Sequence, residues 1–527
     1  MVTGVELTYD STASATAMAE AIFGDSVEVV SASYSGSSYS SAIYSNGDSV
    51  SPYVVPGDTG VILSTGRASD FTNAGGGSND YSNTTTDTGG QNNNSSFNTA
   101  AGTGTYDASY LDIAFIPEGD LMTIQFVFSS DEYPEYSNSI YNDVVLVEVN
   151  GQIVPLSVTQ ESTSVTGINQ NENINLYNDN TADQYNTEMD GFTVTMSMTI
   201  PVTAGEVNTI RIGIADASDA NYDSNLLIAG DSIQTELIAI QDDVTMQEGV
   251  TKVVDVLAND VNNTTGTMTI THINNIPVVA GQSVPLKTGQ IVTLNADGTF
   301  SITTDSDNDT ISFTYETASV DGAGATLETA VGFVTVTTVP CFVAGTLIAT
   351  PGGPVRVEDL QPGDLVLTQD HGPQPVRWAG RRSVAAVGKM APVQIAAGSF
   401  GDHGAVRVSP LHRVLVSGAV AELLFGEPEV LVAARDLVND RSVRRVEGGS
   451  VDYVHIMFDA HQVIFANGLA TESFLPGPQT TSLFEQEIVA EICAIFPELD
   501  PQTGAGYGPA ARRTLSTYEG RLLARVA

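Results

Sequence analysis

The sequence has few cysteines, few cations and no long apolar run, and each scarcity excludes a class of protein. Two cysteines, Cys341 and Cys493, cannot build a disulfide framework, and we expect no bond between them because they lie in different segments. With 63 acidic and 19 basic residues, the formal net charge is −44. That field repels nucleic acid and anionic lipid, so we expect neither as a partner. No apolar run reaches the ~18–20 residues of a transmembrane segment.

The amino terminus also lacks the features of an export signal. Residues 1–10 contain neither a basic n-region nor an apolar h-region, so a cleaved secretory signal is not predicted. The protein is therefore expected to be cytoplasmic or exported by a route that does not read such a signal. The acidic, cysteine-poor composition, rich in Gly, Asp and Asn, favours a secreted or cell-surface bacterial protein.

What the sequence does contain is short β-branched runs separated by Gly, Ser, Thr and Asn, a pattern that predicts many strands and turns. The length of 527 residues allows about three or four domains. We predict a mainly β protein that ends in a short helical tail over residues 478–527. Apolar residues at helical spacing in Ser482–Phe496 and Pro509–Val526 indicate two helices that pack on the preceding module, with Cys493 as a core residue of the first helix. A hydrophobic docking tail is the alternative.

Residues 1–241 contain three blocks that together carry a family resemblance. These blocks read TGVILSTG, FVFSSDEYPEYSNSIYNDVVLVEVNG and IADASDANYDSNLLIAG. They resemble the choice-of-anchor L domain of bacterial surface proteins, and the polar run Gly75–Ala100 between them reads as a long surface loop. The resemblance implies a β-sandwich at a cell surface, with a ligand that the family does not specify.

Three aspartates in the third block are candidate calcium ligands. Asp216, Asp219 and Asp223 could place oxygens around Ca²⁺, which takes six to eight ligands. An acidic surface loop rich in Asx turns explains the same residues. Since no recognised ligand spacing is present, we favour the loop and expect no required cofactor.

Residues 242–339 form a second sandwich candidate. Apolar and polar residues alternate in its strands, as in a sheet with one solvated face. The dipeptide Asp297-Gly298 is a hairpin signal. The segment resembles the cadherin-like or immunoglobulin-like repeats of bacterial adhesins, which implies a spacer.

Cys341 begins the third module, residues 340–477, at a change in composition. Upstream the only cations are Arg67, Arg211, Lys252 and Lys287, whereas cations are common downstream. A lone cysteine at such a seam is a candidate nucleophile, although free cysteine is more often a small buried hydrophobe. The thiol could attack the Pro340 carbonyl and replace the peptide bond with a thioester.

Three further residues complete this predicted chemistry. Ser409 and His412 have the SxxH spacing, in which the hydroxyl hydrogen-bonds the strained peptide and the imidazole donates a proton to the leaving amine. We assign His461 as the second imidazole, which takes the thiol proton or stabilises the intermediate. The predicted catalytic residues are therefore Cys341, Ser409, His412 and His461.

These residues lie in three ordered blocks, CFVAGTLI, SPLHRVLV and DAHQVIFANGL. The blocks resemble the Hint family, the module shared by Hedgehog autoprocessing domains and inteins. The resemblance implies self-cleavage between Pro340 and Cys341 through an N-to-S acyl shift, with water, a thiol or an amine as the acceptor. The ring of Pro340, where Hedgehog proteins carry Gly, is expected to slow the shift.

Two departures from the family pattern limit what is expected. Asn467-Gly468 is followed by Leu469 rather than by an intein's terminal residues, so Asn cyclisation and ligation are not expected. Arg381 stands where Hedgehog has the aspartate that activates sterol, so sterol transfer is not expected either.

Alternatives remain open for individual residues and for the whole protein. His412 and His461 could be core histidines, and Asp459 could orient His461 or be a turn carboxylate. We assign His455 and Trp378 to the structural core. The whole chain could instead be a structural adhesin with an inert Hint cap, or a calcium-stabilised binding sandwich.

Overall fold

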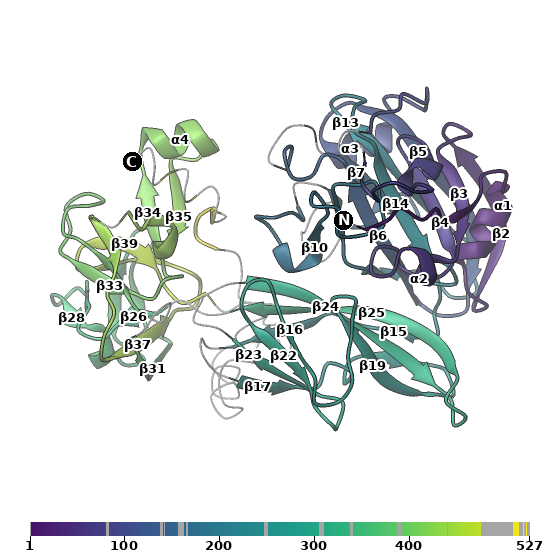
Figure 1. Ribbon diagram of the computed structural model, residues 1–527. Coiled ribbons are helices and arrows are strands. Elements are labelled where there is room, and N and C mark those ends of the chain that lie inside the picture. Colours follow the sequence, from purple (N-terminus) through teal and green to yellow (C-terminus); the bar gives the residue numbers. More distant parts are fainter. Residues whose placement is uncertain are drawn as a thin grey trace. The chain divides into compact units, whose positions relative to one another are not determined.

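The computed structural model is mainly β, as predicted (Figure 1). It describes residues 2–80, 84–137, 141, 143–155, 163–164, 167–246, 251–304, 310–337, 341–386, 391–439, 441–475, 510–515, 520 and 523. The chain divides into two compact units. Unit 1 is Met1–Asp242, Val253–Ile302 and Ile311–Thr335, and unit 2 is Asp243–Lys252, Thr303–Thr310 and Val336–Ala527.

The first 241 residues contain two large antiparallel sheets. One has the order β1-β3-β4-β14-β6-β11-β10, with β12 also on β6. Its strands are β1 (Thr8–Asp10), β3 (Ser41–Ser45), β4 (Gly60–Ser64), β6 (Leu121–Ser130), β10 (Tyr177–Asp179), β11 (Gly191–Thr193), β12 (Met196–Pro201) and β14 (Ser224–Ala229). The other has the order β2-β5-β13-β7-β8, with β9 on β7. Its strands are β2 (Val27–Ser35), β5 (Thr105–Pro117), β7 (Val144–Val149), β8 (Gln152–Ile153), β9 (Thr163–Ser164) and β13 (Asn208–Ala217).

Alternate residues of both sheets meet in one core, which is the arrangement of a β-sandwich. Ile124, Phe126 and Phe128 of β6 share a buried cluster with Leu111 and Ile113 of β5. Helix α1 (Ala15–Ile22) adds its buried face to the same cluster, and its first turn is capped by the Ser14 hydroxyl, which accepts from the Ala17 N–H at 3.1 Å. Helix α2 (Gly47–Val50) is a single turn.

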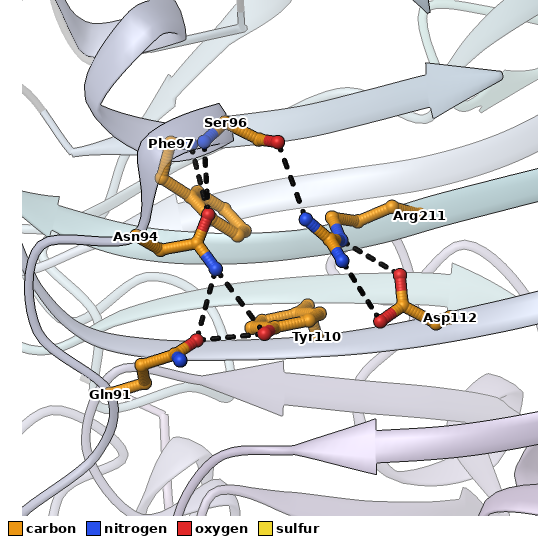
Figure 2. Close-up of polar contacts among 7 residues, drawn as sticks. All are labelled: Gln91, Asn94, Ser96, Phe97, Tyr110, Asp112 and Arg211. Carbon is orange, nitrogen blue, oxygen red and sulfur yellow. Dashed lines mark hydrogen bonds and ion pairs between the residues drawn. The ribbon is translucent and has the colours of Figure 1, made fainter. Parts of the chain in front are cut away.

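The run Gly75–Ala100, predicted to be a surface loop, contains the start of a helix, α3 (Ser95–Ala101). Asn94 caps α3, because its side-chain oxygen accepts from the Ser96 N–H at 3.0 Å. Figure 2 shows how this helix start is tied to the sheet: the Asn94 amide donates to the Tyr110 hydroxyl at 3.2 Å. The prediction missed α3 because a polar low-complexity run gives no apolar period, whereas a local cap can still nucleate a helix.

Arg211, one of only two cations in the first 241 residues, lies on the same face of the sheet (Figure 2). Its guanidinium makes bidentate hydrogen bonds to the Asp112 carboxylate, at 2.7 and 3.0 Å. The Arg211 Cζ atom also lies 4.8 Å from the centroid of the Tyr110 ring. The guanidinium also donates to the Ser96 hydroxyl at 3.3 Å. Arg211 therefore joins β13, β5 and α3, and its charge is matched by a carboxylate.

The spacer contains the two-sheet arrangement expected of it. One sheet includes the order β25-β24-β19-β20 and the other the order β23-β22-β21. The strands are β19 (Thr267–Ile273), β20 (Ile276–Pro277), β21 (Ser283–Pro285), β22 (Ile291–Leu294), β23 (Phe300–Thr303), β24 (Thr310–Val320) and β25 (Thr326–Thr337). Four short strands also belong to this region, β15 (Leu237–Ile238), β16 (Asp242–Thr245), β17 (Thr251–Val254) and β18 (Val261–Asn262). The hairpin predicted at Asp297-Gly298 is confirmed between β22 and β23, with φ +87° at Gly298.

Unit 2 contains two further sheets that enclose one apolar core. The first has the order β31-β37-β26-β33-β32-β36. Its strands are β26 (Phe342–Val343), β31 (Trp378–Ala385), β32 (Val393–Ile395), β33 (Val406–Val408), β36 (Val443–Arg445) and β37 (Ser450–Met457). The second has the order β28-β27-β38-β39-β34-β35, with β29 on β38 and β30 on β29. Its strands are β27 (Leu347–Ile348), β28 (Val355–Arg356), β29 (Leu365–Thr368), β30 (Gly372–Pro375), β34 (Arg413–Ser417), β35 (Glu429–Ala433), β38 (Val463–Ala466) and β39 (Leu469–Glu472), and helix α4 (Ala419–Phe425) lies between β34 and β35 in the chain.

Asn467-Gly468 forms the two-residue turn between β38 and β39. Both residues have positive φ, 48° and 88°, as a tight β-hairpin requires. The Asn467 side chain accepts from the Leu347 N–H at 2.8 Å and donates to the Ala405 carbonyl at 2.6 Å. This asparagine is therefore held as a turn residue, and the chain continues through it into β39.

The tail differs from its prediction over residues 511–515. Residues 511–515 are not helical: Thr514 forms a parallel bridge with Leu431, so backbone pairing with β35 outweighs the helical spacing of Pro509–Val526. Gly520 and Leu523 are helical. Ser482–Phe496, including Cys493, lies outside the described residues. Within the described ranges, no helix has the length and apolar character needed to cross a bilayer.

Candidate functional site

The sheet register of unit 2 places Cys341 next to two polar side chains. Strand β26 lies between β33 and β37, and Phe342 pairs with both Val408 and Val454. Because both neighbours are antiparallel, moving one residue back from Phe342 corresponds to moving one residue forward on each partner. Cys341 therefore lies opposite Ser409 on one side and His455 on the other.

Both neighbours contact Cys341 through hydrogen bonds. The Cys341 backbone N–H donates to the Ser409 hydroxyl at 2.7 Å, and the Ser409 N–H donates to the Cys341 carbonyl at 2.9 Å. The Cys341 thiol lies 3.2 Å from Nε2 of His455. Cys341 is buried, with 7% of its surface exposed. Its nitrogen and its sulfur therefore each have a dedicated partner, a hydroxyl and an imidazole.

Aromatic packing fixes the His455 ring. The ring meets Phe474 edge-on, with centroids 5.4 Å apart and planes at 71°, and Trp378 lies 6.5 Å away. Trp378 is 4% exposed, which places it in the core as expected. His455, which the sequence reading assigned to the core, instead lies beside the candidate nucleophile. The imidazole is therefore oriented at the thiol by rigid apolar neighbours.

His412 lies at the end of the tight turn that Ser409 begins. Its backbone N–H donates to the Ser409 carbonyl at 3.1 Å, and its ring lies 4.2 Å from the Phe342 ring, centroid to centroid. The ring is buried, and within the described ranges neither ring nitrogen has a hydrogen-bond partner. Burial lowers the pKa of His412 to about 4, although the charge of Glu472 opposes this. His412 is therefore a neutral imidazole that packs against Phe342, the residue that follows Cys341. Within the described ranges, both of its ring nitrogens are available for hydrogen bonding.

His461 is not hydrogen-bonded to the thiol, which corrects its predicted position. Its Nδ1 accepts the Ala511 N–H at 2.9 Å, so the ring proton is on Nε2, which donates to the Ser473 carbonyl at 3.1 Å. Nε2 also lies 3.5 Å from a carboxylate oxygen of Glu472. Both ring nitrogens are therefore engaged elsewhere, and His455 occupies the place beside Cys341.

Glu472 is a buried charge that the sequence reading did not single out. Its carboxylate accepts the Arg413 backbone N–H at 2.8 Å and an Arg413 guanidinium N–H at 3.2 Å. Burial would raise the pKa of Glu472, but Arg413, His461 and His412 outweigh it and lower the pKa to about 2. The ionised carboxylate thus holds the backbone directly after His412. No motif spacing marks Glu472, because it acts on a strand 59 residues away in sequence.

Two other candidates have partners away from the thiol. Asp459, considered as an orienting group for His461, instead pairs with Arg377 at 3.1 Å on the surface. Arg381 donates to the Asp452 carboxylate. Neither contact involves Cys341, Ser409 or His412.

The candidate calcium ligands do not converge in the described part of the chain. No group of three His, Cys, Asp or Glu side chains there is placed to hold a metal ion. Asp216 and Asp223 are buried, and the Thr86 N–H donates to Asp223 at 2.8 Å. Asp219 accepts the Asn221 N–H at 3.2 Å. Burial raises the pKa of Asp216 and raises that of Asp223 to about 6. Calcium binding by these residues stays an untested alternative to the predicted Asx-turn loop.

Family models match three successive parts of the chain. Residues 7–234 match the choice-of-anchor L domain, residues 234–337 the bacterial Ig domain and residues 340–478 the Hint domain. The chain therefore combines these three domains in that order, and the spacer is of the Ig type. No curated protein matches the sequence.

Solved structures similar to this chain include inteins. The crystal structure of the MchDnaB-1 intein is 18% identical, with 25% of this chain and 98% of that chain covered and a TM-score of 0.18. The gp41-1 intein is 14% identical, with 25% and 97% covered and a TM-score of 0.17.

Proposed function

We propose that the Hint domain cuts its own chain between residues 340 and 341 through an N-to-S acyl shift. One observation carries the proposal: the Cys341 thiol lies 3.2 Å from an imidazole nitrogen while the amide nitrogen of the same residue is bonded to Ser409. A nucleophile beside a base, with the leaving nitrogen held separately, is the arrangement that acyl transfer requires. The Hint family match supports the same reaction.

The proposed first step exchanges an amide for a thioester. His455 Nε2 takes the thiol proton, the sulfur attacks the carbonyl carbon of Pro340, and the bond from that carbon to the Cys341 nitrogen breaks. The nitrogen leaves with one additional proton, so the proton lost by sulfur balances the proton gained by nitrogen. Residue 340 itself lies outside the described residues, and its carbonyl carbon is covalently bonded to the Cys341 nitrogen.

Ser409 and His412 act on the leaving nitrogen in this proposal. The Ser409 hydroxyl, 2.7 Å from that nitrogen, orients the peptide bond. His412 is neutral near pH 7 because burial lowers its pKa to about 4. To protonate the departing nitrogen, this neutral ring must first take up the proton that the sulfur gives to His455; because its pKa is about 4, it then passes that proton on readily.

The second step passes the acyl group to water, a thiol or an amine. Water releases residues 1–340 with a new carboxylate, whereas an amine links them to another molecule. A choice-of-anchor L domain followed by an Ig spacer fits a secreted or cell-surface protein. In that setting, transfer to an amine would attach the two amino-terminal domains covalently to an acceptor, leaving the surface ligand of the first domain to be identified.

The proposal is tested by incubating the purified chain with and without dithiothreitol, which attacks thioesters. We expect fragments with the masses of residues 1–340 and 341–527. The Cys341→Ala variant should not produce these fragments. His455→Gln should lower the cleavage rate by about a hundredfold, the scale of one general base. His371→Gln is the matched control, because His371 is exposed and its ring contacts Gln462. A chain that stays intact under all conditions overturns the proposal and leaves a structural role for the Hint domain.

A further inference from the structure

The segment 510–515 lies beyond the residues that match the Hint domain, yet it packs within unit 2. Its backbone adds to the edge of β35: the Leu431 N–H donates to the Arg513 carbonyl at 2.8 Å and the Leu515 N–H to the Leu431 carbonyl at 2.9 Å. The Leu515 side chain joins the apolar core of the unit. Strand β35 is last in its sheet order, so the segment covers a backbone edge.

Arg512 fastens this segment through two ion pairs. Its guanidinium donates to both oxygens of Asp370, at 2.7 and 3.1 Å, and to Glu429 at 2.7 Å. Bidentate hydrogen bonding between a guanidinium and a carboxylate is among the strongest geometries for an ion pair. One side chain therefore joins the segment to the turn between β29 and β30 and to the start of β35.

The segment also reaches the interior through a single backbone donor. The Ala511 N–H bonds to His461 Nδ1, which places the ring proton on Nε2. From Nε2, contacts continue to Glu472 at 3.5 Å, and Glu472 accepts the Arg413 N–H at 2.8 Å. Arg413 directly follows His412, so a continuous set of contacts connects the segment with the turn that carries Ser409 and His412.

We propose that segment 510–515 is a clasp that positions the 409–412 turn, so that self-cleavage requires the clasp to be docked. This inference rests on the proposed cleavage and adds His461, Glu472 and Ala511 as positioning residues. It gives His461 a role that differs from contact with the thiol. It also sets an order of events, because cutting at Cys341 cannot begin before residues 510–515 have been synthesised and have docked.

The decisive variant in the full chain is Ala511→Pro, which removes the one N–H that His461 accepts. Ala511→Gly is the matched control, because it keeps that N–H and is equally small. Ala511→Pro should slow cleavage at least about tenfold through misplacement of the turn, whereas Ala511→Gly should stay within about twofold. Nitrogen NMR of labelled histidine should show the Nε2–H form of His461 in the parent and in Ala511→Gly, and loss of that fixed form in Ala511→Pro.

Trp378 fluorescence shows whether the Ala511→Pro variant folds. If it does not fold, Arg512→Gln tests the same requirement for a docked segment. It removes the ion pairs at the surface and should also slow cleavage. The clasp proposal is overturned if the folded variants cleave at the parent's rate and His461 keeps its Nε2–H form in them. If the parent does not cleave, the proposed function fails by itself, and the NMR form of His461 in Ala511→Pro still decides whether the segment controls this ring.

Discussion

His412 should make the stability of unit 2 fall as the solution becomes acidic. Burial lowers its pKa from 6.5 to about 4, so the unfolded chain binds this proton more readily than the folded chain does. The contribution is therefore fully present above pH 6.5 and is lost as the pH falls from 6.5 toward 4. The full difference corresponds to about 3 kcal/mol, of which about 2 kcal/mol is lost by pH 5. His412→Gln should not show this loss.

Urea unfolding at pH 7.5 and pH 5.0 measures this difference. Trp378 is the only tryptophan of the chain and is buried in β31, so its fluorescence reports on unit 2. Both chains carry Cys341→Ala to prevent cutting. Glu472, whose pKa is lowered to about 2, stays ionised at pH 5 and does not contribute. The reasoning is refuted if His412→Gln loses as much stability between the two pH values as its parent.

Two further predictions concern Ser409 and the amino-terminal sandwich. Ser409→Ala should slow cleavage about tenfold on a gel, because the Cys341 N–H loses its acceptor, while Ser409→Thr should keep most of the rate; equal rates for both would contradict the role of the hydroxyl. Burial, and then the charge of Asp143, raise the pKa of Glu132, so its contribution to stability is lost as the pH rises above about 4.5. Calorimetry should therefore show a higher melting temperature for Glu132→Gln than for the parent at pH 8. The exposed control Glu206→Gln should show no such gain. Melting temperatures of the parent and of Glu132→Gln that change in parallel with pH would contradict this prediction.

Local sequence patterns predicted those parts of the molecule that depend on neighbouring residues. The hairpin at Asp297-Gly298 follows from turn chemistry, and the contact of Ser409 with Cys341 agrees with the SxxH pattern that singled out this serine. The three domains also follow from ordered motifs. These features need little knowledge of which distant strands pair.

Long-range pairing decided what the sequence could not predict. His455 and His461 lie close together in the sequence, and only the pairing of β37 with β26 shows which of them meets the thiol. Glu472 and Ala511 gain their positions from partners far away in the chain. In the tail, the helical spacing was overridden over residues 511–515 by the free edge of β35.

The most direct test of the account is to trap the acyl group on the sulfur of Cys341. Hydroxylamine converts a thioester to a hydroxamate, which mass spectrometry can locate on a single residue. The account predicts a hydroxamate at the carboxyl end of Pro340, a carboxyl-terminal fragment that begins with a free Cys341 amine, and neither product in Cys341→Ala. A chain that remains whole in hydroxylamine, or the same fragments from Cys341→Ala, would contradict it.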